Sequence, residues 1–150
     1  MIESIAHAIH GDYLANAASA SGSSPSMVPW SQLPEEFRES NRNQARDILH
    51  KLQALGFGIA PAEHARHIAP IELSPSQVEV LARMEHDRWM EEKQRNGWVR
   101  GPARDNERKV HPDIVPWEEL DEPAREKDRN PVRAIPRLLA AIGFEIVPLP

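Results

Sequence analysis

The stretch that decides the fold is residues 115–148, VPWEELDEPAREKDRNPVRAIPRLLAAIGFEIVP. Residues 28–61 read almost the same, VPWSQLPEEFRESNRNQARDILHKLQALGFGIAP, and the two windows of 34 residues share 17 identical positions without a gap. Self-similarity of this kind indicates an internal repeat. The sequence therefore predicts one small structural unit that occurs twice.

The similarity continues upstream, where residues 81–89, LARMEHDRW, match residues 5–13, IAHAIHGDY. The offset is 76 residues here and 87 in the later window, so the second copy is longer by eleven residues, within segment 97–114. We predict a degenerate first copy at 1–61, a linker at 62–73 and a second copy at 74–150, which together form one compact unit.

Helix signals give each copy the order helix, loop, helix, short strand. Ser74, followed by Pro75 and by Gln77, is a capping box that predicts a helix from 75 to about 95. Asn43 and Asn130 suit the N-caps of the second helices.

Glycines and a proline set the ends and the shape of the second helices. Gly56 and Gly143 are the expected C-terminal stops, and Pro136 should bend the last helix. Short strands at 58–60 and 145–147 could then pair with each other. The predicted fold class is α+β and mostly helical, with two pseudo-symmetric repeats that share their apolar faces.

Composition narrows the class of protein. The chain has no Cys, no apolar run near the ~20 residues of a membrane span and a net charge of −5. These features favour a soluble cytoplasmic protein, without membrane partners and without binding to a nucleic-acid polymer, which relies on surplus Lys and Arg.

The second copy resembles the ryanodine receptor repeat (RyR domain) family over about residues 74–147. The matching motifs are His86 and Trp89 on the first helix, then Gly97-Trp98, Gly101-Pro102, Arg104-Asp105, Lys109, His111-Pro112, Val115-Pro116-Trp117 and the helix end LLAAIGF at 138–144. The resemblance implies a small α+β module that occurs in tandem pairs. Bacterial and phage members of this family look like sensor or binding modules for nucleotides or nucleotide-derived signals, which implies a similar role here. It does not imply a pore.

A nucleotide needs a flat apolar surface for its base, and stacking on an aromatic ring contributes roughly 1–3 kcal/mol. The candidates are the four tryptophans, which all fall at motif positions: Trp98, Trp117, Trp89 and Trp30. One or two of them could instead belong to the core. Trp98 follows a glycine in a polar loop, and we predict that Trp98→Ala abolishes ligand binding without loss of the fold.

Phosphates need cations or N–H donors. The candidates are Arg100, Arg104, Lys109 and Arg129, although nearby carboxylates make internal salt bridges an open alternative. His86 and His111 could each hydrogen-bond a ligand or a buried carbonyl.

Neither a metal nor a cofactor is expected. His64 and His67 have helical ligand spacing, but a third ligand is not evident. Nucleophile and phosphate-loop motifs are missing, so no catalytic residue is assigned. Glu85 beside His86 leaves an enzyme acting on a nucleotide as a third hypothesis.

The first hypothesis is a non-catalytic binding module that holds a nucleotide or nucleotide-derived signal in the cleft between the copies. Without a fused effector, it would sequester the ligand or pass the signal to a separate effector protein. The second hypothesis is an interaction or scaffold module, in which the same Trp and Arg side chains dock another protein or form a homodimer.

Overall fold

The structure is a computed structural model that describes residues 1–17, 26–62 and 71–150. It is α+β and mostly helical, as predicted. The contacts divide the chain into two compact units, residues 1–71 with 135–150, and residues 72–134. Within the described residues, no helix combines the length and the apolar character that a membrane span needs.

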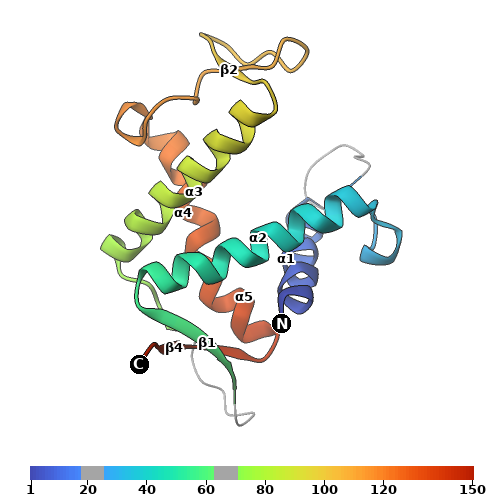
Figure 1. Ribbon diagram of the computed structural model, residues 1–150, viewed down its shortest axis with the longest axis vertical. Helices are drawn as coiled ribbons and strands as arrows, with labels where there is room; N and C mark the ends of the chain where they lie inside the picture. The colour runs from blue at the N-terminus through green and yellow to red at the C-terminus, as the bar shows by residue number, and fades with distance from the viewer. Residues whose placement is uncertain (18–25, 63–70) are drawn as a thin grey trace. The chain divides into compact units, whose positions relative to one another are not determined.

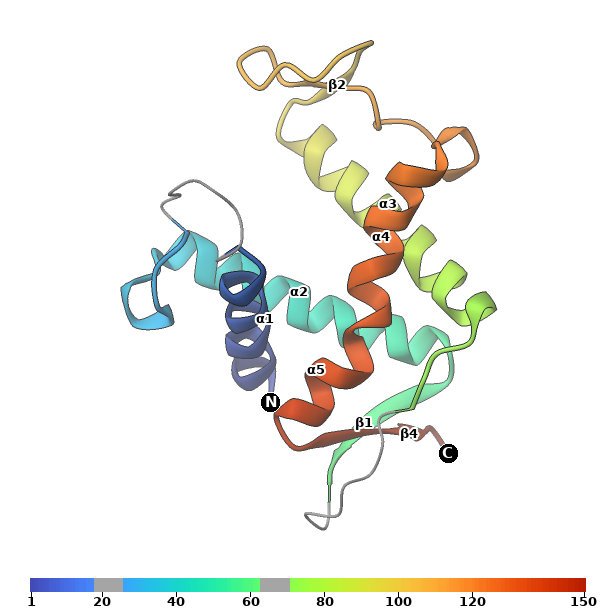
Figure 2. The same ribbon diagram turned by 180° about the vertical axis from the view of Figure 1, so that it is seen from behind.

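The first unit contains α1 (Ile2–Ala17), the 3-10 turn η1 (Trp30–Gln32), α2 (Glu35–Ala54), β1 (Phe57–Pro61), α5 (Ile135–Ala141) and β4 (Phe144–Pro148). Helices α1 and α2 pack against each other, and α5 contacts α1 and β4 (Figures 1 and 2). Its apolar core includes Ile5, Leu52 and Leu139, which are all fully buried.

Strand β1 pairs with β4 in antiparallel fashion, with Ile59 opposite Ile146 (Figure 1). This confirms the predicted pairing of the two terminal strands. The pairing also explains why the compact units do not follow the linker at 62–73: the end of the second copy belongs with the first unit.

The second unit contains α3 (Pro75–Arg95), β2 (Val99–Arg100), β3 (Val110–His111), the 3-10 turn η2 (Trp117–Glu119) and α4 (Glu122–Arg133). Helix α3 packs on α4, and β2 and β3 form a short parallel pair in the long connection between them (Figure 2). Gly101 lets this connection fold back on itself, because a Cβ there would clash with a methyl carbon of Val110.

The first helix of the second copy has the predicted limits. The Ser74 hydroxyl accepts the Gln77 N–H and the Gln77 side chain accepts the Ser74 N–H, so the capping box is confirmed.

The N-caps predicted at Asn43 and Asn130 are wrong, because both helices begin about two turns earlier. Helix α2 starts after Pro34, and α4 starts after Asp121, whose carboxylate accepts the Ala124 N–H. The acidic first turns at Glu35 and Glu122 stabilise these earlier starts, since carboxylates favour the positive end of a helix.

Proline interrupts the second helix of the second copy, as expected from Pro136. Helix α4 ends at Arg133 and α5 begins at Ile135, whereas α2 runs unbroken through the equivalent positions. Pro136 has no N–H to donate to the Val132 carbonyl, which removes one helical hydrogen bond at the break.

The two copies repeat their contacts as well as their elements. The imidazole of His10 donates from Nε2 to the Val28 carbonyl, and His86 donates to Val115 in the same way, both at 2.7 Å. In each copy one arginine binds three glutamates at equivalent positions: Arg42 with Glu3, Glu35 and Glu39, and Arg129 with Glu79, Glu122 and Glu126. The residues common to both copies therefore hold the fold together.

Substituting Gly143 tests the helix stop. Gly143 has φ +82°, and a Cβ added there would have nothing within 4 Å of it, so Gly143→Ala adds backbone strain alone. We expect it to lower the free energy of unfolding in urea by about 1–2 kcal/mol. Gly11→Ala is the matched control, since Gly11 is exposed within α1 and alanine there should add about 1 kcal/mol. Equal effects of the two substitutions would contradict this role for Gly143.

Candidate functional site

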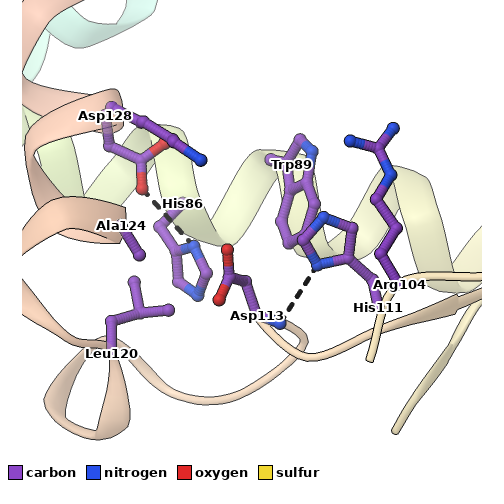
Figure 3. A pocket seen from close by; sticks show the side chains of 9 residues that line it. His86, Trp89, Arg104, His111, Asp113, Leu120, Ala124 and Asp128 are labelled. Carbon is purple, nitrogen blue, oxygen red and sulfur yellow. Dashed lines mark hydrogen bonds and ion pairs between the residues drawn. The ribbon is translucent and has the colours of Figure 1, made fainter. Parts of the chain in front are cut away.

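The second unit contains a pocket with a volume of about 180 Å³ (Figure 3). Aromatic, cationic and acidic side chains line it together: His86, Trp89, Arg104, His111, Asp113, Leu120, Ala124, Lys127 and Asp128. Its volume is below the roughly 300–1,000 Å³ of typical ligand pockets, so it can enclose one ring system rather than a whole nucleotide.

Three segments build the pocket. Helix α3 presents His86 and Trp89 on one face, because residues three apart lie on the same side of a helix. The connection after β2 contributes Arg104, His111 and Asp113, and α4 contributes Lys127 and Asp128. Arg104 and His111 thus come from the segment that only the second copy has.

His86 forms the buried end of the pocket and is 2% exposed. Its Nε2 donates to the Val115 carbonyl, and its Nδ1 lies 3.5 Å from Asp128 Oδ2 (Figure 3). Burial opposes a charge on this ring, but the Asp128 carboxylate and the Val115 carbonyl outweigh burial and raise the pKa of His86. The ring therefore binds a proton more readily beside Asp128 than a free imidazole does.

His111 and Trp89 form the aromatic wall. Their ring centroids are 4.9 Å apart at 77°, an edge-to-face contact. The Asp113 N–H donates to His111 Nδ1 at 3.1 Å, which requires that nitrogen to be unprotonated. Burial lowers the pKa of His111, and the positive charges of Arg104, Lys93 and Lys127 lower it further, against the influence of Asp113. His111 is therefore a neutral ring with its proton on Nε2.

Two cations at the pocket are available to a ligand. Both Arg104 and Lys127 are exposed, and among the described residues neither belongs to an ion pair. Arg104 uses only its Nε, which donates to the Asn106 side chain at 3.0 Å. Its terminal guanidinium nitrogens and the Lys127 ammonium can therefore bind an anion.

The structure brings four of the predicted site residues together in this pocket: His86, Trp89, Arg104 and His111. Trp98 lies next to it, half-buried, with Lys93 Nζ over its ring at 4.3 Å and His111 at 6.4 Å. Arg100 is exposed on β2. Lys109 donates to the Asn96 carbonyl at the end of α3 instead of lining the pocket.

The remaining predicted residues are held by contacts within the protein. Trp117 is 3% exposed and three guanidinium groups cover its ring, so no face is open to stacking. Arg129 is held by its three glutamates, which raise its pKa. Trp30 belongs to the first unit, stacked on His7 at 4.1 Å. The predicted site between the two copies remains a prediction.

Asp113, Lys127 and Asp128 were missed by sequence reasoning. A signal for two of them exists in the repeat itself: Lys127 and Asp128 replace Ser40 and Asn41 of the first copy, and Ala124 replaces the larger Phe37. The copies therefore differ at these three pocket positions, whereas they agree at the positions that hold the fold.

The structure gives Glu85 and His86 separate partners. Glu85 pairs with Arg88, at 2.8 Å and 3.1 Å, while His86 contacts Val115 and Asp128. Within the described ranges no group of three or more His, Asp or Glu side chains could hold a metal ion. His64 and His67 lie outside the described residues.

Replacing Asp128 by asparagine should lower the pKa of His86, because the substitution removes the charge that favours the imidazolium. A raised folded-state pKa contributes stability that is full below the unfolded value of 6.5 and is lost as pH rises through the folded value. In Asp128→Asn the loss of stability between pH 6 and pH 8 should therefore be smaller. Histidine titration by NMR and urea unfolding at pH 6 and pH 8 would measure both effects.

An unchanged His86 titration in Asp128→Asn would show that Asp128 does not control the charge of the ring.

A comparison with protein families matches residues 68–148 to the RyR domain. The match covers more than half of the chain and contains every residue that lines the pocket.

Proposed function

The chain belongs to the RyR domain family, and from this premise and the pocket geometry we propose that it is a non-catalytic module that binds a nucleotide or nucleotide-derived ligand. The observation that carries the proposal is the pairing of the Trp89 and His111 rings with the cations Arg104 and Lys127 around one pocket. A ring offers stacking to a base, and the cations offer charge-assisted hydrogen bonds to phosphate.

The difference between the copies supports a binding role over a purely structural one. Arg42 and Arg129 are held by glutamates at equivalent positions of the two copies, whereas no ion pair in the described part of the chain engages Arg104 or Lys127. Exposed cations without an ion-pair partner keep most of their hydration and contribute little to folding. Their position beside an aromatic pocket is better explained by a ligand.

Binding can be tested by thermal shift and calorimetry with mono-, di- and cyclic nucleotides and ADP-ribose derivatives. A ligand at a hundred times its Kd stabilises the folded state by about 2.7 kcal/mol, so the melting temperature should rise. The double variant Arg104→Gln/Lys127→Gln should bind more weakly and with less dependence on salt. Arg100→Gln is the control, because Arg100 is exposed in the same connection but does not line the pocket.

The same experiment separates the other two functions. An absence of any shift, together with a concentration-dependent dimer in light scattering, would favour a protein-interaction module. Chemical conversion of a nucleotide during incubation would favour an enzyme. Either result would overturn the proposal.

A further inference from the structure

The Asp113 carboxylate is a pocket group with no partner in the described part of the protein. Asp113 is half-buried, and among the described residues no hydrogen bond or ion pair engages its side chain; only its backbone N–H is used, by His111. In Figure 3 the Asp113 side chain lies among the labelled side chains that line the pocket. A ligand N–H at this position could donate a charge-assisted hydrogen bond to the carboxylate.

The charged groups around the pocket divide into hydrogen-bond acceptors and hydrogen-bond donors. A carboxylate only accepts hydrogen bonds, while Lys127 and the terminal nitrogens of Arg104 only donate them. One part of a ligand must therefore carry N–H donors toward Asp113, and another must be anionic to bind the cations. The aromatic wall of Trp89 and His111 requires that the donor-bearing part is a flat ring.

We infer that the pocket selects aromatic rings with an exocyclic amino or amide group, such as aminopurines and aminopyrimidines, and that Asp113 determines this specificity. The inference rests on the proposed function. A keto oxygen in place of the amino group would face the carboxylate and repel it, so that only the neighbouring ring N–H of the oxo base could donate to Asp113. Sites that hydrogen-bond a ligand N–H discriminate strongly against the analogue that lacks it.

Two pairs of nucleotides isolate this contact: AMP with IMP, and CMP with UMP. Within each pair the phosphate and sugar are the same, and an amino group is exchanged for an oxo group. Calorimetry on the full chain should show that the amino member binds at least about tenfold more tightly, which corresponds to about 1.4 kcal/mol.

Asp113→Asn should abolish the preference, because an amide can donate to an oxo group as well as accept from an amino group. IMP and UMP should then bind more tightly than they bind the native protein. Glu107→Gln removes the same charge from an exposed position in the same connection and should keep the native preference.

Equal affinities within both pairs in the native protein would overturn the inference while leaving the proposed function in place. An undiminished preference for the amino nucleotides in Asp113→Asn would also overturn it, since a group other than Asp113 would then determine the specificity for the ring. If none of the four nucleotides binds, the inference fails, and the wider nucleotide panel decides separately whether the proposed function fails with it. The native comparison does not depend on the folding of any variant.

Discussion

Leu81→Ala is expected to lower the free energy of unfolding by about 2–5 kcal/mol, a large part of the roughly 5–15 kcal/mol that stabilises a typical domain. Leu81 is fully buried on α3, which also carries His86 and Trp89. Truncation removes buried apolar surface and leaves a cavity, because the surrounding side chains relax only in part. Urea unfolding measures the loss, and hydrogen exchange locates it along the chain.

Val80→Ala is the matched control for this prediction. Val80 is on the same helix but 44% exposed, so its truncation should change stability by less than about 0.5 kcal/mol. Because α3 positions two sides of the pocket, Leu81→Ala should also weaken ligand binding near its melting temperature. A similar effect of the two substitutions would mean that α3 does not pack as described.

Trp89→Ala is expected to weaken nucleotide binding by the roughly 1–3 kcal/mol that a stacked base contributes, which is about a fivefold to 150-fold rise in Kd. Trp89 lines the pocket, whereas Trp98 lies beside it under Lys93. The structure thus changes the expectation from sequence that Trp98→Ala abolishes binding: the larger effect is now expected at Trp89, and Trp98→Ala is the comparison. Calorimetry at constant ionic strength measures both.

Stability must be followed in the same experiment, because Trp89 also contacts His86 and His111. Trp89→Phe keeps an aromatic face and should recover part of the affinity. If Trp98→Ala weakens binding more than Trp89→Ala does, the ligand lies outside this pocket, toward β2.

Local signals explain which parts of the fold the sequence predicts. The capping box at Ser74, the glycine stops and the strand ends depend on neighbouring residues, and all three are confirmed. The starts of α2 and α4 were missed because Asn43 and Asn130 are good caps in isolation. Acidic first turns and packing against α1 and α3 override that preference.

The pocket was harder to predict than the helices. His86 and Trp89 share a helix face, so their proximity follows from spacing alone. Asp113 and Asp128 line the same pocket only because the segment after β3 lies against it and helix α4 packs on α3. These contacts are a property of the tertiary structure. Arg129 was a phosphate candidate with salt bridges to nearby carboxylates as the alternative. The structure shows the salt bridges, and the partner that the sequence could not indicate is Glu79, fifty residues away.

The pairing of β1 with β4 has a consequence for any attempt to isolate the second copy. A fragment that begins at residue 68, where the family match starts, would keep β4 but lose its partner, and a row of main-chain amides and carbonyls would then lie open to solvent. Such edges recruit strands from neighbouring molecules and promote aggregation. The boundary of a family match is therefore not a place at which this polypeptide can safely be cut.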